Sequence, residues 1–141
     1  MRRREVSSGS KTNAKRNGAL LMAAFTVACF TGAAARADGD AVKGKAAFAR
    51  QCAICHTSDK DGGIRFGPNL FGIVGKKAGA VPGYDYSNAF KTRAKWEWTE
   101  DALGSWIMFP ATMVPGTKMA AFQGIAERDR DDLVAYLATL K

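Results

Sequence analysis

The sequence predicts an all-α fold with long loops, and three observations support this prediction. Apolar residues recur at helical spacing in the C-terminal segment, where Leu133, Tyr136, Leu137 and Leu140 lie three or four positions apart. Glycine and proline are dense between residues 57 and 83, which is typical of loops with tight turns. No segment alternates apolar and polar residues convincingly enough to predict a strand.

The first 37 residues are predicted to be a cleaved secretory signal peptide. A basic stretch at 1–17 precedes an uncharged, alanine-rich run at 18–35, and Ala35-Arg36-Ala37 matches a small-residue cleavage signal. The alternative is a retained membrane anchor, but the run is marginal in length for spanning a bilayer. The mature chain is then one domain, residues 38–141.

Most of the net positive charge comes from the predicted signal peptide. The whole chain has a formal net charge of +8, whereas residues 38–141 hold 14 basic and 12 acidic residues, a net of +2. The high basicity of the chain therefore does not predict binding to nucleic acid.

The first helix of the mature chain is predicted to run from Ala41 to about His56. Asp40 is a good N-cap for it, and Gly44 and Phe48, four positions apart, share one face. The loop at 57–83 that follows is long enough to need something to pack on. A flat apolar cofactor would provide a surface for this loop to pack on.

Three further helices are predicted along the rest of the chain. A short one spans Ser87 to about Ala94. Thr99 caps the next, with acidic residues in its first turn, and Pro110 ends it. The last runs from about Arg128 to Leu140. The apolar face of the helix after Thr99 comprises Leu103, Trp106 and Ile107.

The segment Cys52-Ala53-Ile54-Cys55-His56 has the C-x-x-C-H spacing of c-type haem attachment. Two thiols at this spacing can reach the two vinyl groups of one porphyrin, and the adjacent imidazole supplies an axial ligand. The alternatives are half a zinc site or a redox dithiol. A zinc site lacks further ligands, because Cys29 is the only other cysteine and His56 the only histidine. The motif predicts one covalently bound haem c.

The second axial ligand has to be something other than histidine, and methionine is the usual remaining choice. Residues 38–141 offer Met108, Met113 and Met119. Methionine more often fills gaps in a core, and Met108, on or just past an apolar helix face, is expected to do so. Met119 follows the irregular segment 114–118, which would present its sulfur at a set position.

Residues 40–141 resemble a class I cytochrome c of the mitochondrial or bacterial cytochrome c2 type. The resemblance implies a cytochrome c fold, with three to five helices and long loops wrapped around one covalent haem. The matching segments, in the family's order, are Cys-Ala-Ile-Cys-His-Thr (52–57), Gly-Pro-Asn-Leu (67–70), Pro-Gly-Tyr-x-Tyr-Ser (82–87), Trp-Thr-Glu (98–100), Val-Pro-Gly-Thr-Lys-Met (114–119) and Arg-x-Asp-Leu-Val-Ala-Tyr-Leu (130–137).

The resemblance also implies roles for individual residues. Cys52 and Cys55 would carry the thioethers, while His56 and Met119 would be the axial ligands. The carbonyl of Pro68 would accept a hydrogen bond from the other ring N–H of His56. The residues implied to hydrogen-bond around the haem propionates are Tyr84, Trp98 and Thr117. The residues implied to lock the first helix to the last are Gly44, Phe48, Leu133 and Tyr136.

The sequence departs from the family at three places. Lys76 stands where an arginine near a propionate is common, and the two are not interchangeable as donors. Trp106 stands where a tyrosine usually approaches the methionine sulfur. The segment 120–124 is shifted by about one residue, which moves Phe122 relative to the family's aromatic residue.

The function implied is that of a one-electron carrier rather than an enzyme, with transient docking between membrane or periplasmic redox complexes in a bacterial periplasm. The expected partners are a cytochrome bc1-type donor and an oxidase or reaction-centre acceptor. Contact with the membrane would come only through these partners, and the protein is expected to be a monomer. A haem enzyme or ligand sensor is the rival, but peroxidase-like chemistry wants a distal acid–base group, usually a histidine. A dedicated acceptor for one dehydrogenase is a further alternative.

Charge is expected to be asymmetric on the folded domain. Such asymmetry would steer docking to acidic partners; the alternative is that these are solvated surface charges. The basic residues in segments that flank the haem in this family are Lys76, Lys77, Lys91, Arg93, Lys95 and Lys118. The acidic residues near the last helix are Glu127, Asp129, Asp131 and Asp132.

Overall fold

Residues 39–141 are described by the computed structural model, so the predicted signal peptide at 1–37 lies outside the described residues. None of the helices within 39–141 is both long enough and apolar enough to cross a lipid bilayer. The proposed start of the mature chain at residue 38 therefore remains a prediction.

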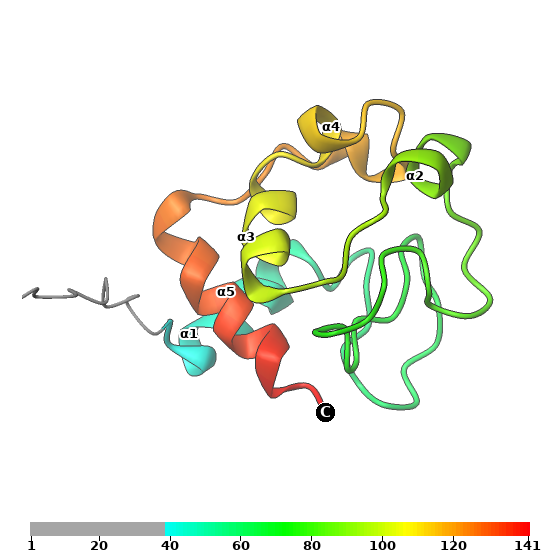
Figure 1. The fold of residues 1–141 in the computed structure, drawn as a ribbon. Helices are drawn as coiled ribbons and strands as arrows, with labels where there is room; N and C mark the ends of the chain where they lie inside the picture. Colours follow the sequence, from blue (N-terminus) through cyan, green and yellow to red (C-terminus); the bar gives the residue numbers. More distant parts are fainter. Residues whose placement is uncertain (1–38) are drawn as a thin grey trace, which may run out of the picture. The chain divides into compact units, whose positions relative to one another are not determined.

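Helices and loops make up the described chain (Figure 1). The prediction of an all-α fold with three to five helices is confirmed, because five α-helices are present. Within residues 39–141 the β structure is limited to an isolated bridge between Lys77 and Glu97. The elements in order are α1 (Ala41–Gln51), α2 (Asn88–Arg93), α3 (Glu100–Met108), α4 (Pro110–Met113), the 3-10 helix η1 (Lys118–Ala121) and α5 (Glu127–Thr139).

Side-chain caps set three of the helix starts, as their sequences predict. The carboxylate of Asp40 accepts hydrogen bonds from the first backbone amides of α1, and the hydroxyls of Ser87 and Thr99 do the same for α2 and α3. Helix α1 ends at Gln51, earlier than predicted. The amides of Cys52 and Ala53 both donate to the carbonyl of Phe48, at 2.8 and 3.0 Å, and the chain then turns.

The region between α3 and α5 holds two short helices that the sequence patterns did not indicate. Pro110 does not simply end α3, because it is also the first residue of α4, a position that proline suits. Thr117 caps η1 by accepting a hydrogen bond from the amide of Met119. Both elements have four residues, too few to show a helical repeat.

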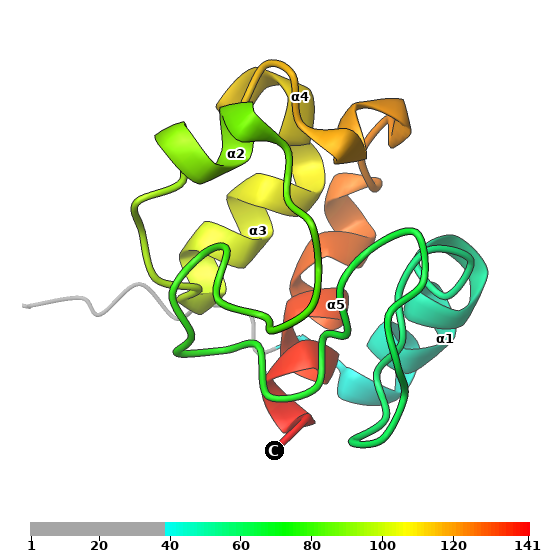
Figure 2. The ribbon, with the colours of Figure 1, turned by 90° about the vertical axis from the view of Figure 1, so that its right-hand side faces the viewer.

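Helices α1 and α5 pack side by side (Figures 1 and 2). The rings of Phe48 and Tyr136 lie with centroids 5.5 Å apart. A Cβ on Gly44 would come within 1.8 Å of the carbonyl oxygen of Asp132, so only glycine permits this approach. This contact matches the predicted lock between the first and last helices.

The long loop after α1 crosses the domain in front of α5 (Figure 2). Backbone hydrogen bonds hold it to the segment before α3, from Gly75 to Trp98 and from Ala78 to Trp96, both at 2.9 Å. The amide of Gly72 donates to Leu140 near the C-terminus. These bonds leave an interior space between the loop and the helices.

Candidate functional site

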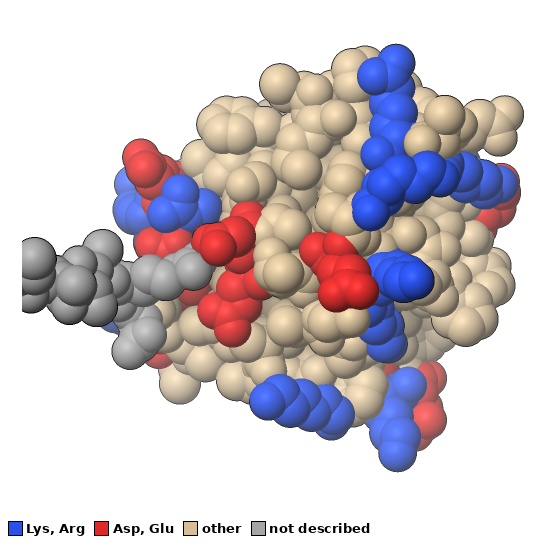
Figure 3. Space-filling model, viewed as in Figure 1, with Lys and Arg blue, Asp and Glu red and all other residues tan. Residues whose placement is uncertain are grey.

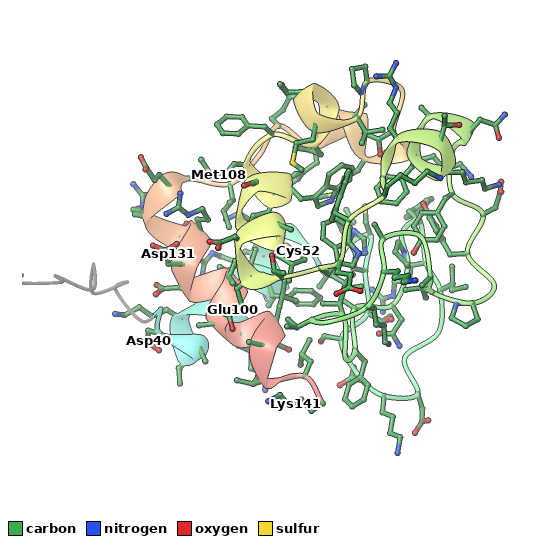
Figure 4. The ribbon with its side chains drawn as sticks, in the orientation of Figure 1. Asp40, Cys52, Glu100, Met108, Asp131 and Lys141 are labelled. Atoms are coloured by element: carbon green, nitrogen blue, oxygen red, sulfur yellow. The ribbon has the colours of Figure 1, made fainter. Side chains whose placement is uncertain are left out.

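A cavity with about 1160 Å3 of empty space, part of it open to solvent, lies inside the domain. Apolar and aromatic side chains make up most of its wall, as is usual for cofactor sites. Figure 4 labels Cys52, which lies among the packed side chains at the centre of the view. Every predicted site residue lines this one cavity: Cys52, Cys55, His56, Pro68, Tyr84, Trp98, Thr117 and Met119.

The imidazole of His56 is held in a fixed orientation. Its Nδ1 lies 2.8 Å from the carbonyl oxygen of Pro68, so Nδ1 carries the proton that it donates, and Nε2 is left with its lone pair. Burial lowers the pKa of His56, and the hydrogen bond to Pro68 opposes this in part. A neutral ring with an available Nε2 is the form of histidine that binds a metal.

Gly67 is a site residue that sequence analysis did not single out by itself. A Cβ at this position would lie 2.3 Å from Cε1 of His56, so the backbone can pass against the imidazole only because residue 67 is glycine. The amide of Gly67 also donates to the carbonyl of Cys55 at 2.7 Å. Gly67 therefore packs against the face of the His56 ring, and Pro68 accepts the hydrogen bond from its Nδ1.

Neither Cys52 nor Cys55 is in a disulfide, and both thiols are half-buried. Burial, with a smaller contribution from Cys55, raises the pKa of Cys52 to about 11. Redox-active dithiols have a lowered thiol pKa, so the redox-dithiol interpretation is not supported. Within residues 39–141 no three His, Cys, Asp or Glu side chains gather as metal ligands, so these residues build no zinc site.

Met119 is the methionine that the fold brings to the cavity. The indole Nε1–H of Trp106 donates to its sulfur at 3.1 Å, and the hydroxyl of Thr117 accepts from its amide at 3.3 Å. Met108 and Met113 are partly buried against the hydrophobic core and are not part of the cavity wall. Trp106 therefore holds the sulfur of Met119, and Thr117 holds its backbone.

An aromatic cluster forms one wall of the cavity. Trp106 and Trp98 lie with ring centroids 5.8 Å apart, and Phe90 contacts both. The hydroxyl of Tyr84 donates to the carbonyl of Phe66 at 3.0 Å, which ties the 82–87 segment to the loop before Gly67. Tyr86 and Phe90 also line the cavity, and no motif had marked Phe90.

Two of the departures from the family pattern have clear structural outcomes. Lys76 does not line the cavity, and its ammonium group instead donates to the carbonyl of Phe71 at 3.0 Å. In the shifted segment, Ala121 and Phe122 both line the cavity. An aromatic side chain therefore still reaches the cavity wall there, one residue later in the chain.

Charge is distributed unevenly, as expected. On the face shown in Figure 3, acidic side chains gather over α5 and α3, with some basic side chains among them at the left, and the other Lys and Arg side chains lie towards the right and the lower edge. Lys91 and Lys118 both pair with the carboxylate of Asp85, at 2.9 and 3.0 Å. These two hydrogen-bonded ammonium groups lower the pKa of Asp85 to about 2. Of the six predicted basic residues, Lys118 alone lines the cavity.

The donor set fits a covalently attached haem. The cavity offers two thiols, an imidazole nitrogen and a thioether sulfur on an otherwise apolar wall. A porphyrin needs apolar surroundings, two thiols for its vinyl groups and two axial donors, and these residues match all three requirements.

Comparison with known proteins agrees with this geometry. Residues 41–141 match the family described as "Cytochrome c". The chain is 47% identical over 102 residues to "Cytochrome c" of Gibberella zeae, covering 72% of this chain and 94% of that protein. It is 47% identical over 104 residues to "Cytochrome c" of Euglena viridis, covering 73% and 99%. It is 44% identical over 103 residues to "Cytochrome c2" of Rhodopila globiformis, covering 73% and 95%.

Proposed function

The chain belongs to the cytochrome c family of electron carriers, and on that premise we propose that it carries single electrons on one haem c, with His56 and Met119 as the axial ligands. When bound, the haem iron supplies the Fe2+/Fe3+ couple. The observation that carries the proposal is the convergence of Cys52, Cys55, His56 and Met119 on one apolar cavity.

The residues around the two axial donors orient them. Pro68 fixes the tautomer of His56 and Gly67 leaves room for its ring. Trp106 and Thr117 hold Met119, whose backbone lies in η1. With His56 and Met119 both bound to the iron, no coordination position would be left for a substrate, which suits electron transfer rather than catalysis.

The wall of the cavity favours the reduced state. Apolar side chains exclude water and disfavour the additional charge of the oxidised centre, and a thioether ligand acts in the same direction. The most deeply buried of these wall residues are Leu133 and Leu137 of α5. We assign Tyr84, Trp98 and Thr117 to the polar edge of the cofactor, because all three line the cavity and each carries a hydrogen-bonding group.

The setting we propose is the periplasm of a bacterium, reached through a cleaved signal peptide at 1–37. There a monomer would dock transiently to a cytochrome bc1-type donor and to an oxidase or reaction-centre acceptor. The N-terminal basic and apolar segments of the sequence support export.

Absorption spectra of the purified holoprotein test the proposed ligands. The ferric protein should show the weak long-wavelength band of a methionine sulfur bound to haem iron. Met119→Ala should abolish this band and lower the reduction potential. Met113→Ala should change neither, because Met113 is not part of the cavity wall. The opposite pattern would reassign the ligand, and a ferric protein without the band at neutral pH would contradict the six-coordinate carrier.

A further inference from the structure

Three tryptophan rings connect the cavity to the outside of the domain. Trp98 and Trp106 are buried, and both line the cavity. Trp96 lies in the segment that joins α2 to α3 (Figure 1) and does not line the cavity. Its ring centroid is 5.6 Å from that of Trp98 and 6.3 Å from that of Trp106. These separations are typical of aromatic rings in contact, so the three rings form a continuous path, which we call the tryptophan relay (Trp96, Trp98 and Trp106).

The inner end of the tryptophan relay contacts the proposed axial ligand. The Nε1–H of Trp106 donates to the sulfur of Met119 at 3.1 Å, so this ring touches an atom that would bind the iron. Electronic coupling between two groups falls steeply with the gap between them, and rings in contact leave almost no gap. The relay therefore offers electrons a route from the cofactor to Trp96.

Trp96 is the outer end of the relay. Part of its ring is exposed to solvent, and this exposure does not depend on a cofactor in the cavity, because Trp96 is not part of the cavity wall. All tryptophan and tyrosine residues of the chain lie within residues 39–141. The others line the cavity or are buried: Tyr84, Tyr86, Trp98, Trp106 and Tyr136. An oxidant on the rest of the surface therefore meets an indole or phenol ring only at Trp96.

The indole N–H of Trp96 is buried and has no hydrogen-bond partner within residues 39–141. An unpartnered buried N–H costs free energy, so packing alone does not favour an indole at this position. An oxidised indole readily loses its N–H proton to an acceptor, and this loss traps the oxidised state on that ring. Trp96 has no such acceptor, and Trp106 has only a thioether sulfur, which is a weak one. The oxidised state therefore stays mobile along the relay.

We propose that the tryptophan relay gives the reduced protein a second reaction, the one-electron reduction of strongly oxidising oxygen- or nitrogen-centred radicals at Trp96. The radical takes one electron from the Trp96 ring and becomes an anion, which leaves the ring as a protonated cation radical. Trp96 then takes an electron from Trp98 or Trp106, and that inner ring is refilled from the ferrous cofactor, which becomes ferric. One electron passes through the protein, and no proton moves within it. This inference rests on the proposed function, because the haem supplies the electron.

Pulse radiolysis of the ferrous holoprotein in azide solution tests the relay. The probe is the azide radical, a one-electron oxidant of indole rings, and transient absorption follows both the tryptophan radical and the oxidation of the haem. The wild-type protein should show the spectrum of the protonated cation radical. This radical should decay as the haem is oxidised, at a rate that neither protein concentration nor heavy water changes. In the ferric protein it should persist longer, because no electron is available to refill the ring.

Trp96→Phe retains a ring and removes the oxidisable indole. The yield of tryptophan radical and the share of haem oxidised in the concentration-independent phase should both fall several-fold. Tyr86→Phe is the matched control, because Tyr86 is also half-buried and oxidisable but its ring contacts are with Tyr84 and Phe90. It should behave like the wild type. Equal losses in the two variants would overturn the proposal, as would a wild-type radical with the spectrum of the deprotonated neutral form.

Voltammetry of the same samples with a small mediator separates this inference from the proposed function. A reversible wild-type couple, together with haem oxidation that Trp96→Phe leaves unaltered, would refute the relay alone. The lack of a reversible couple in the wild-type protein would refute the carrier itself. The spectrum and the heavy-water comparison use only the wild-type protein, so they decide the question even where Trp96→Phe fails to bind haem.

Discussion

The indole nitrogen of Trp106 lies 3.1 Å from the sulfur of Met119, and its N–H points at that sulfur. Trp106 is buried in α3, whereas Met119 is in η1. The contact therefore links the rigid helical part of the domain to the short element that presents the proposed ligand. A hydrogen bond to this sulfur withdraws electron density from it, so the sulfur stabilises an oxidised iron less well.

Trp106→Phe is expected to lower the reduction potential. The change removes the donor and retains an aromatic ring, and a neutral hydrogen bond is worth about 0.5–1.5 kcal/mol. For a one-electron couple this corresponds to at most about 65 mV. Voltammetry of the holoprotein measures the shift. Trp96→Phe is the control, because Trp96 belongs to the same cluster, with its ring 6.3 Å from that of Trp106, but does not line the cavity. A similar shift in both variants would refute the role of this hydrogen bond.

The site residues could be predicted from short motifs because covalent chemistry restricts their spacing. Cys52, Cys55 and His56 have to be near neighbours in sequence, and a long fixed segment has to carry Met119 back to the same cofactor. The place of Phe90 in the aromatic wall could not be predicted in this way. It meets Trp98 and Trp106 through tertiary packing between segments that carry no shared pattern.

Helix boundaries also divide into those that local sequence determines and those that tertiary contacts determine. The starts of α1, α2 and α3 depend on local caps and were predicted within a residue or so. The end of α1 and the existence of α4 and η1 depend on contacts with the rest of the domain. Gly67 shows most clearly what the sequence alone does not reveal. That this position has to be glycine becomes evident only in the folded domain, where the ring of His56 lies against its backbone.

Gly67→Ala is expected to impair the site through His56. The new Cβ would lie 2.3 Å from Cε1 of the ring, so the ring or the loop has to move, at a cost of about 1–3 kcal/mol. Urea unfolding of the holoprotein should show this loss, and the spectrum should report altered axial ligation. Gly63→Ala is the control in the same loop, because a Cβ there meets nothing within 4 Å. Equal effects at both positions would mean that the clash with His56 is relieved at no cost.

Two glycines within helices should respond to alanine in opposite directions. Gly44→Ala should destabilise the domain by about 2 kcal/mol or more, because its Cβ would lie 1.8 Å from a backbone oxygen of α5. Gly104→Ala should stabilise it by about 0.5–1 kcal/mol through helix propensity. Its nearest neighbour is the flexible side chain of Arg130 at 3.5 Å. Thermal and urea unfolding measure both, and a stabilising Gly44→Ala would contradict the close packing of α1 on α5.

Acid should weaken the attachment of the segment before Met119 through Asp85. Hydrogen bonds from Lys91 first and Lys118 second lower the pKa of Asp85 from 3.8 to about 2. A carboxyl group with a lowered pKa in the folded state stabilises the fold at pH values above its unfolded pKa. That contribution is complete at neutral pH and is lost as the pH falls from about 4 through 2.

Asp85→Asn removes this pH-dependent contribution. The unfolding free energy of the wild-type protein should exceed that of the variant near neutral pH, and the difference should shrink as the pH falls to about 2. Because all three side chains are exposed, added salt should also reduce it. Asp61→Asn is the control, since Asp61 is an exposed loop residue that forms no ion pair within residues 39–141. A difference between wild type and Asp85→Asn that stays constant from neutral pH to pH 2 would show that the two lysines do not act on Asp85 through its charge.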